Sequence, residues 1–167
     1  PSTGTISTGT AGGDFGINVK LSGYDQVIIK GKAKKPGYIR INGDEVEICD
    51  AGDVWGKDTY ETTDRLWEKH GRQYAVVAMG TAGERLVNTT ICLVDKCTSW
   101  GKGGLPAIMG SKNLKAFIAY GNKGCPYNCH HYSGKVEWNE GLCPVAEDVI
   151  PRIVSTNNMI TVATAAP

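Results

Sequence analysis

The sequence predicts an α+β domain, because strand-like and helix-like segments alternate without a regular order. Segments 38–41 and 46–48 are strand-like and flank Asn42-Gly43, a strong hairpin signal since both residues tolerate positive φ. Residues 58–70 follow the period of an amphipathic helix. A doubly wound parallel sheet fits less well, because a hairpin makes neighbouring strands antiparallel.

The first segment, residues 1–13, has a Thr, Ser and Gly content that is typical of a linker. Phe15 and Val19 then recur at helical spacing, which predicts a short helix. A glycine-rich loop before a helix can present backbone N–H groups to an anion, although most such loops are ordinary connections. The run Val27-Ile28-Ile29 predicts a strand over residues 25–30.

The helix of residues 58–70 has signals at both ends. Asp58 is expected to cap its N-terminus, with Glu61 three residues on, and Gly71 to end it in the left-handed conformation. His70 can be read as a catalytic base or as a last-turn residue that packs on the core, and the second reading is the commoner one. One face of the helix is expected to carry Thr63, Leu66, Trp67 and His70.

The second half of the domain contains three further apolar runs. They predict strands over residues 74–79, 91–94 and 114–120. Two glycine-bearing stretches between these strands, 80–83 and 100–104, are expected to be loops.

Charge and hydropathy argue against several classes of function. The 167 residues include 18 Lys and Arg against 17 Asp and Glu, so the net charge of +1 gives no basic field for general nucleic-acid binding. No apolar run approaches the roughly 18 residues of a membrane span. No charged-then-apolar leader opens the chain either. We therefore expect a cytoplasmic protein with no membrane partner.

Glycine is unusually frequent, at 22 of 167 residues. It forms two clusters, Gly12-Gly13 and the stretch of Gly101, Gly103 and Gly104. Because glycine has no Cβ, backbone N–H groups can converge there on a bulky anion, and Lys102 adds a positive charge. The alternative is a pair of tight turns. Neither a P-loop pattern nor a convincing Gly-x-Gly-x-x-Gly supports a nucleotide site.

The six cysteines fall into different settings. Cys49 and Cys92 lie in strand-like runs and are expected to be small buried hydrophobes. Cys125 and Cys129 flank a polar loop and could supply two thiolates to an iron–sulfur cluster, which normally needs four. A zinc site that adds one imidazole of His130-His131 is the alternative.

The string Met109-Gly-Ser-Lys-Asn-Leu-Lys-Ala116 resembles the N-terminal domain of the aldehyde ferredoxin oxidoreductase family, the tungsten or molybdenum pterin enzymes. The resemblance covers about residues 1–120, and the matching strings occur in the family's order. These strings include Gly12-Gly-Asp-Phe-Gly16, Gly23-Tyr-Asp25, Ile29-Lys-Gly-Lys32, Trp55-Gly-Lys-Asp-Thr59, Gly80-Thr-Ala-Gly-Glu84 and Gly101-Lys-Gly-Gly104.

The resemblance implies both a fold and a cofactor. The fold is an α+β domain with two β-sheets and short helices over residues 1–120, truncated at its N-terminus, and an irregular tail over residues 121–167. The domain would form a base for a tungsten or molybdenum bis-pyranopterin. The residues implied to contact it lie at and beside the glycine clusters: Thr10, Gly12, Gly13, Thr98, Ser99, Gly101, Lys102 and Gly103.

The family also has Cys-x-x-Cys-x-x-x-Cys and a distant fourth cysteine, which together hold a [4Fe–4S] cluster. Cys125 and Cys129 match the second and third cysteines and are the implied metal ligands, whereas Asn122 stands at the first and Cys143 is a poor match for the fourth. The family's helical domains have no counterpart here, which implies a fragment. Thr98-Ser-Trp100 stands where the family often has Arg-Ala-Ala, and such departures point to a divergent branch, for example the class II benzoyl-CoA reductase catalytic subunits.

The implied function is the tungstopterin-binding portion of an oxidoreductase that converts an aldehyde to a carboxylate and passes electrons through the cluster to ferredoxin. Ferredoxin and a small aldehyde would be partners of the intact enzyme, which could be a homo-oligomer. We expect this chain alone to be inactive, and no catalytic residue can be named. The alternatives are a non-catalytic truncated or recombined domain without cofactor, a piece of a class II benzoyl-CoA reductase subunit, and a zinc-binding module.

Overall fold

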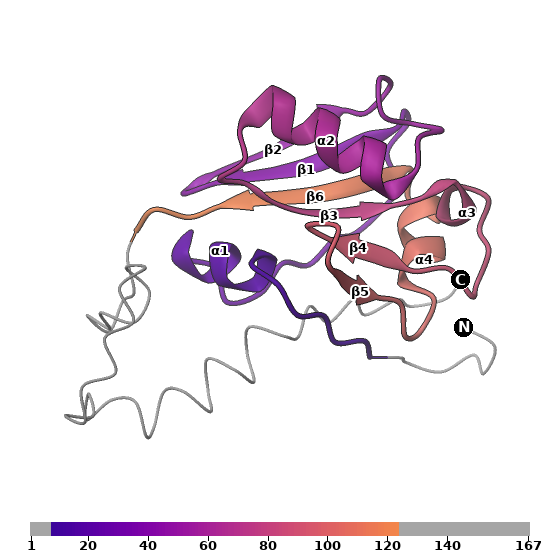
Figure 1. Ribbon diagram of the computed structural model, residues 1–167, viewed down its shortest axis with the longest axis horizontal. Helices are drawn as coiled ribbons and strands as arrows, with labels where there is room; N and C mark the ends of the chain where they lie inside the picture. Colours follow the sequence, from indigo (N-terminus) through magenta and orange to yellow (C-terminus); the bar gives the residue numbers. More distant parts are fainter. Residues whose placement is uncertain (1–7, 124–167) are drawn as a thin grey trace.

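One mixed β-sheet organises residues 8–123, the part of the chain that the computed structural model describes (Figure 1). Its strands are β1 (Gly37–Asn42), β2 (Glu45–Asp50), β3 (Ala75–Met79), β4 (Cys92–Val94), β5 (Thr98–Trp100) and β6 (Leu114–Tyr120). The helices are α1 (Phe15–Leu21), α2 (Thr59–His70), α3 (Thr81–Glu84) and α4 (Leu105–Ser111).

The strands follow the order β2-β1-β6-β3-β4-β5 across the sheet. All neighbours are antiparallel except β1 and β6, which are parallel. The α+β class is confirmed. The described residues nevertheless form one sheet of six strands instead of the two expected sheets, because β6 pairs with β1 on one side and with β3 on the other.

The sheet separates two apolar clusters. One face packs against α1 and α4, chiefly through Phe15 and Met109, and the opposite face packs against α2 through Leu66. Figure 1 shows α2 and α1 on opposite sides of the sheet. Both faces of the central strands are therefore removed from water, and all five residues of β3 are buried.

The predicted hairpin forms, but its turn lies one residue later than expected. Asn42 pairs with Glu45, so the central turn residues are Gly43 and Asp44, and Gly43 takes the positive φ of 56°. Asn42 stays in the strand because β1 also pairs with β6, where Asn42 is opposite Tyr120.

The predicted helix over residues 58–70 is confirmed. The Asp58 side chain accepts a hydrogen bond from the Glu61 N–H at 2.8 Å, which caps the N-terminus. Leu66 is buried and Trp67 is half-buried on the predicted face. Gly71 ends the helix with φ 100° and ψ 153°, so its φ is positive as expected but its ψ lies outside the left-handed helical range.

Other elements differ from the predictions. Strands near 74–79, 91–94 and 114–120 are confirmed as β3, β4 and β6. Residues 25–30 form no strand, because Val27 and Ile29 pack on the sheet face beside α1 and α4 while the sheet edges belong to β2 and β5. The expected loop over residues 80–83 is largely the short helix α3, and β5 and α4 were not predicted.

Candidate functional site

The two glycine clusters, far apart in the sequence, lie side by side. We name residues 9–13 the first glycine segment and residues 101–104 the second. A Cβ built on Gly12 would lie 3.2 Å from Thr98 Cγ2, and one on Gly9 would lie 2.7 Å from the Lys102 carbonyl oxygen. Figure 1 shows the indigo N-terminal trace passing beside β5, which leads directly into the second segment.

Absence of side chains is what lets the first glycine segment approach β5 so closely. A Cβ on Gly13 would lie 2.9 Å from Val94 Cγ1, and Gly13 also has φ 94°, a conformation that other residues rarely adopt. A Cβ on Gly9 would collide with main chain at Lys102 and with Trp100 Nε1 at 2.8 Å. These glycines therefore serve the packing of the protein on itself at the site.

The second glycine segment is supported by residues 88–91. A Cβ on Gly101 would lie 2.2 Å from Ile91 Cγ2, and one on Gly104 would lie 3.1 Å from the Asn88 carbonyl oxygen. Gly103 and Gly104 have φ of 86° and 72°, which turns the chain sharply into α4. Two consecutive positive φ angles explain why both positions are glycine, because other residues rarely adopt this conformation.

The surface where the segments meet offers backbone donors. Thr10, Gly12, Gly13 and Lys102 are exposed. Within residues 8–123, the backbone N–H groups of Gly12, Gly13, Lys102 and Gly103 donate no hydrogen bond to another residue. Several unpaired N–H groups beside a lysine form a surface suited to an anion such as phosphate.

Two of the other predicted residues take different positions on β5. Thr98 is half-buried on the side that faces the first glycine segment. Ser99 is exposed and, because side chains alternate along a strand, lies on the opposite face of the sheet. The structure therefore does not bring Ser99 together with the other predicted cofactor residues.

The Trp100 side chain lies in the apolar core beneath the two glycine segments. Its side chain is 3% exposed and belongs to the apolar cluster on the α1 and α4 face. Its Nε1 is buried and has no hydrogen-bond partner within the described part of the chain. Among the described residues, this corner of the site therefore contains a buried donor without a partner, and leaving such a group unpaired costs about 1–3 kcal/mol.

The predicted metal ligands cannot be placed. Cys125 and Cys129, and with them His130-His131 and Cys143, lie outside the described residues. Among residues 8–123, no group of three or more His, Cys, Asp or Glu side chains could hold a metal ion.

The remaining cysteines occupy three environments. Cys92 is fully buried, as predicted, and burial raises the pKa of its thiol far above the usual range. Cys49 is only half-buried and packs at the margin of the α2-side cluster, while Cys97 is exposed.

His70 has the structural role that a last-turn histidine more often has. Its Nε2 lies 2.8 Å from the Tyr38 hydroxyl oxygen, and its ring packs against the rings of Tyr38 and Tyr74. Burial, and then the positive charge of Arg40, lowers the pKa of His70. These contacts connect the end of α2 to the sheet and give no indication of a catalytic base.

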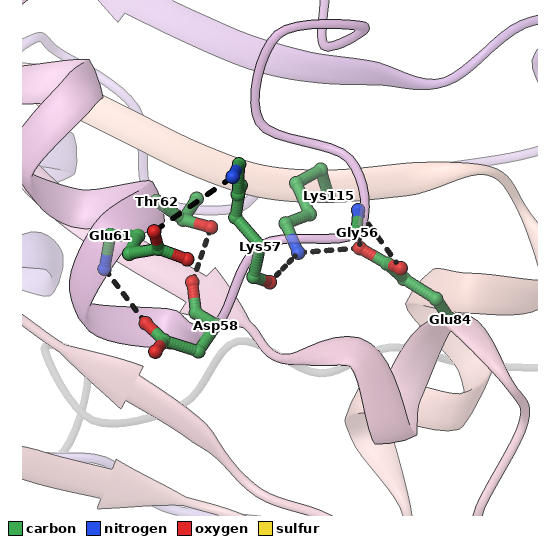
Figure 2. Close-up of polar contacts among 7 residues, drawn as sticks. All are labelled: Gly56, Lys57, Asp58, Glu61, Thr62, Glu84 and Lys115. Carbon is green, nitrogen blue, oxygen red and sulfur yellow. Dashed lines mark hydrogen bonds and ion pairs between the residues drawn. The ribbon is translucent and has the colours of Figure 1, made fainter.

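A buried ion pair between Glu84 and Lys115 was not predicted (Figure 2). Lys115 Nζ lies 2.5 Å from Glu84 Oε1 and 2.7 Å from the Lys57 carbonyl oxygen, and the two side chains are 0% and 8% exposed. The Gly56 N–H donates to both oxygens of the Glu84 carboxylate, at 2.9 and 3.1 Å. Burial lowers the pKa of Lys115, and the hydrogen bond with Glu84 opposes this shift.

A signal for this pair was present in the sequence. Lys115 is the one charged residue in the apolar run 114–120, and Glu84 belongs to one of the strings that carry the family resemblance. A lysine in a buried strand needs a partner, because an unpaired buried charge is very costly. The partner could not be identified, since 31 residues separate the two positions.

Comparison with known proteins gives consistent matches. Residues 1–121 match the family model described as "Aldehyde ferredoxin oxidoreductase, N-terminal domain". The chain is 42% identical over 127 residues to a tungsten-containing aldehyde ferredoxin oxidoreductase of Pyrococcus furiosus, covering 75% of this chain and 21% of that protein. It is 36% identical over 126 residues to an aliphatic sulfonate oxidoreductase, WOR-like subunit, of the same organism, covering 68% and 20%.

A solved structure is also similar. It is the active-site complex BamBC of benzoyl coenzyme A reductase with 1,5 dienoyl-CoA. The TM-score is 0.61 and the identity 33%, over 68% of this chain and 17% of that chain. The chain spans only about a fifth of the length of the two Pyrococcus furiosus relatives named above.

Proposed function

This chain belongs to the aldehyde ferredoxin oxidoreductase family, and we propose that residues 1–120 form a pterin-binding domain and residues 121–167 a separate tail. One observation carries the proposal: the first glycine segment packs on β5 beside the second, with Gly12 and Gly13 facing Thr98. The two glycine clusters therefore lie on one surface, as two halves of one binding site would.

The residues at this surface fit a large phosphorylated ligand. Gly12, Gly13 and Gly103 would donate backbone N–H groups, and the exposed Lys102 would neutralise phosphate charge. When bound, a tungsten or molybdenum bis-pyranopterin supplies the two-electron oxidation of an aldehyde to a carboxylate, with the oxygen taken from water. Thr10, Thr98 and Gly101 would line the same surface, and Ser99 would contribute only from the other face of β5.

The intact enzyme would need more than this chain. A [4Fe–4S] cluster takes four ligands, and Cys125 and Cys129 would supply two of them. Electrons would leave through that cluster to ferredoxin, and the substrate would be a small aldehyde. We expect the intact enzyme to be cytoplasmic and to have no nucleic-acid partner. It could be a homo-oligomer. This chain alone would therefore bind cofactor without turnover.

One structural observation bears on the expectation that the protein has no membrane partner. Within residues 8–123, no helix is both long and apolar enough to cross a bilayer.

Cofactor binding can be tested on the chain itself. Produced in a host that makes tungstopterin and purified without oxygen, the chain should carry pterin with tungsten or molybdenum. Lys102→Gln should lower the pterin content about tenfold or more, because a charge-assisted hydrogen bond to phosphate contributes about 1.5–3 kcal/mol and each 1.4 kcal/mol is a factor of about ten in affinity. Lys32→Gln is the matched control, since Lys32 is also an exposed lysine but lies outside both glycine segments.

Each alternative has its own outcome in this experiment. Absence of pterin and metal would favour a non-catalytic domain, and about one zinc per chain without visible absorption would favour a zinc module. Equal pterin content in the two lysine variants would contradict the assigned surface. Sustained aldehyde-dependent reduction of a viologen dye would contradict the expectation of an inactive chain.

A second candidate is a piece of a class II benzoyl-CoA reductase-type catalytic subunit. The similar benzoyl coenzyme A reductase structure favours it. The two candidates share the pterin surface, so metal content does not separate them. Oxidation of a dienoyl-CoA by the full-length enzyme, without activity toward aldehydes, would select this candidate.

A further inference from the structure

Lys115 owes its buried position to a β-bulge at the start of β6. Gly37 pairs with Leu114 and Tyr38 pairs with Ala116, so Lys115 is the extra residue between them. A bulge redirects the side chain of the extra residue. Here it places the Lys115 ammonium between the Lys57 carbonyl and the Glu84 carboxylate, as Figure 2 shows.

Glu84, the last residue of α3, fixes this short helix in place. Its carboxylate accepts from Lys115 and from the Gly56 N–H, so contacts from β6 and from the loop before α2 hold it. A helix of four residues has little stability of its own, because its ends leave most backbone groups unpaired. The side-chain anchor is therefore a major determinant of where α3 lies.

α3 in turn contacts α4 main chain to main chain. A Cβ on Gly110 would lie 2.0 Å from the Gly83 carbonyl oxygen, and one on Gly83 would lie 3.0 Å from Pro106 Cβ. α4 begins directly after the second glycine segment, which ends at Gly104. A shift of α3 would therefore move α4 and the segment that leads into it.

The chain that follows α3 contacts the same segment from another side. Asn88 packs on Gly104 and Ile91 packs on Gly101 at the distances given above. Leu86 has φ 61°, a conformation that is costly for a side chain of this size and that fixes the path out of α3. The second glycine segment is thus supported by α4 and by residues 88–91. Both supports adjoin α3, whose last residue, Glu84, is held by Lys115.

We propose that Glu84 and Lys115 are positioning residues that set the second glycine segment, through α3 and α4 on one side and residues 88–91 on the other. For the consequence on cofactor binding, this inference rests on the proposed function. The positioning itself does not depend on it.

Amide hydrogen exchange of the 167-residue chain tests the positioning. In Glu84→Gln, the amides of Gly104 and Ile108, which donate to Gly101 O and Gly104 O at 3.2 Å, should exchange at least tenfold faster, while α2 amides change little. Leu66→Ala, a destabilising change on the opposite face, is the control and should instead accelerate α2 amides. The same exchange pattern in both variants would overturn the proposal.

A double variant decides the case if Glu84→Gln does not fold. Glu84→Leu with Lys115→Met replaces the buried pair by apolar groups of similar size, which often restores stability. The positioning role predicts that Gly104 still exchanges fast in this variant, because the bond to the Gly56 N–H is gone. Exchange like that of the natural chain would mean that the pair has a stabilising role only, and would overturn the proposal.

Pterin content provides a second readout. Glu84→Gln should lose pterin, whereas Leu66→Ala, measured where both remain folded, should retain it. If the natural chain itself carries no pterin, the proposed function fails and the exchange experiment still decides the inference. If Glu84→Gln exchanges fast but retains its pterin, the link from positioning to cofactor binding is refuted.

Discussion

His70 lies with its imidazole between the rings of Tyr38 and Tyr74, and its surroundings decide its charge. Arg40 on β1 and Lys69 on α2 oppose protonation, and Glu47 and Asp53 partly favour it. Because burial is the largest influence, the pKa of His70 in the folded protein lies below its ordinary value of 6.5. The protonated form is therefore better tolerated by the unfolded chain.

This shift makes stability depend on pH. Between the lowered pKa and 6.5 the unfolded chain binds more protons at this site than the folded one, so the free energy of unfolding should decrease as pH falls through that window. Urea unfolding at pH 7.5, 6.5 and 5.5 measures it. His70→Asn keeps a hydrogen-bonding group opposite Tyr38 but cannot titrate, and should remove this part of the decrease.

Comparison with the variant also separates His70 from Asp95. Burial raises the pKa of the Asp95 carboxyl, whose oxygen accepts the Val76 N–H at 2.7 Å, and a raised carboxyl pKa makes the folded state gain stability as pH falls. Both proteins contain Asp95, so its effect cancels in their difference. An identical pH dependence in the natural chain and in His70→Asn would refute the role of His70.

At the scale of elements, the first glycine segment packs so closely on the β4–β5 hairpin that the glycine positions leave no room for a Cβ atom. Gly13→Ala should destabilise the fold by about 2–4 kcal/mol, because it combines the strain of positive φ with a collision 2.9 Å from Val94 Cγ1. Gly31→Ala should cost only about 1–2 kcal/mol. Gly31 also has positive φ, at 75°, but a Cβ there meets nothing within 4 Å.

Chemical denaturation of the two alanine variants gives the comparison. The difference between them isolates the packing of the first glycine segment on β4, since both substitutions strain the backbone in a similar way. Equal losses of stability would mean that the segment does not occupy this position in solution. The adjacency on which the proposed cofactor surface depends would then fail as well.

Elements with their own local signals were predictable, and elements defined by distant contacts were not. α2 has a cap, a periodic face and a glycine stop within its own residues, and it was predicted almost to the residue. α3 is only four residues long and owes its place to Lys115, 31 residues away from Glu84. Residues 25–30 have strand-like composition, but strand formation needs a free sheet edge, which no local pattern reveals.

The candidate site shows the same division. Its glycines were recognisable because their excess is itself unusual, and the two clusters lie side by side in the structure. That they form one cofactor surface stays a prediction. The opposite orientation of Ser99 depends on where β5 starts, and β5 was not predicted. The buried pair of Glu84 and Lys115 depends on a bulge in β6, whose register is set by β1.

At the scale of the whole molecule, β6 joins two parts that the sequence suggests are separate. It pairs in parallel with β1 of the first hairpin and antiparallel with β3, so all strands of residues 8–123 belong to one hydrogen-bonded sheet. The apolar cluster on each face contains residues of β1, β3 and β6. If either β1 and β2 or β3, β4 and β5 separated from the sheet, apolar surface of the remaining strands would therefore be exposed to water.

This connection predicts a single cooperative unfolding transition for residues 8–123. Trp67 reports on the α2 face and Trp100, 3% exposed, on the α1 and α4 face. Two variants that each retain one of these tryptophans, with the others replaced by Phe, should each show one fluorescence transition in urea. Far-ultraviolet circular dichroism on the same variant should give the same midpoint, because all the strands unfold together. The substitutions can shift overall stability, so each variant is its own reference. A fluorescence midpoint displaced by more than about 0.5 M urea from that of the backbone signal would instead indicate two units that unfold separately, as two independent sheets would.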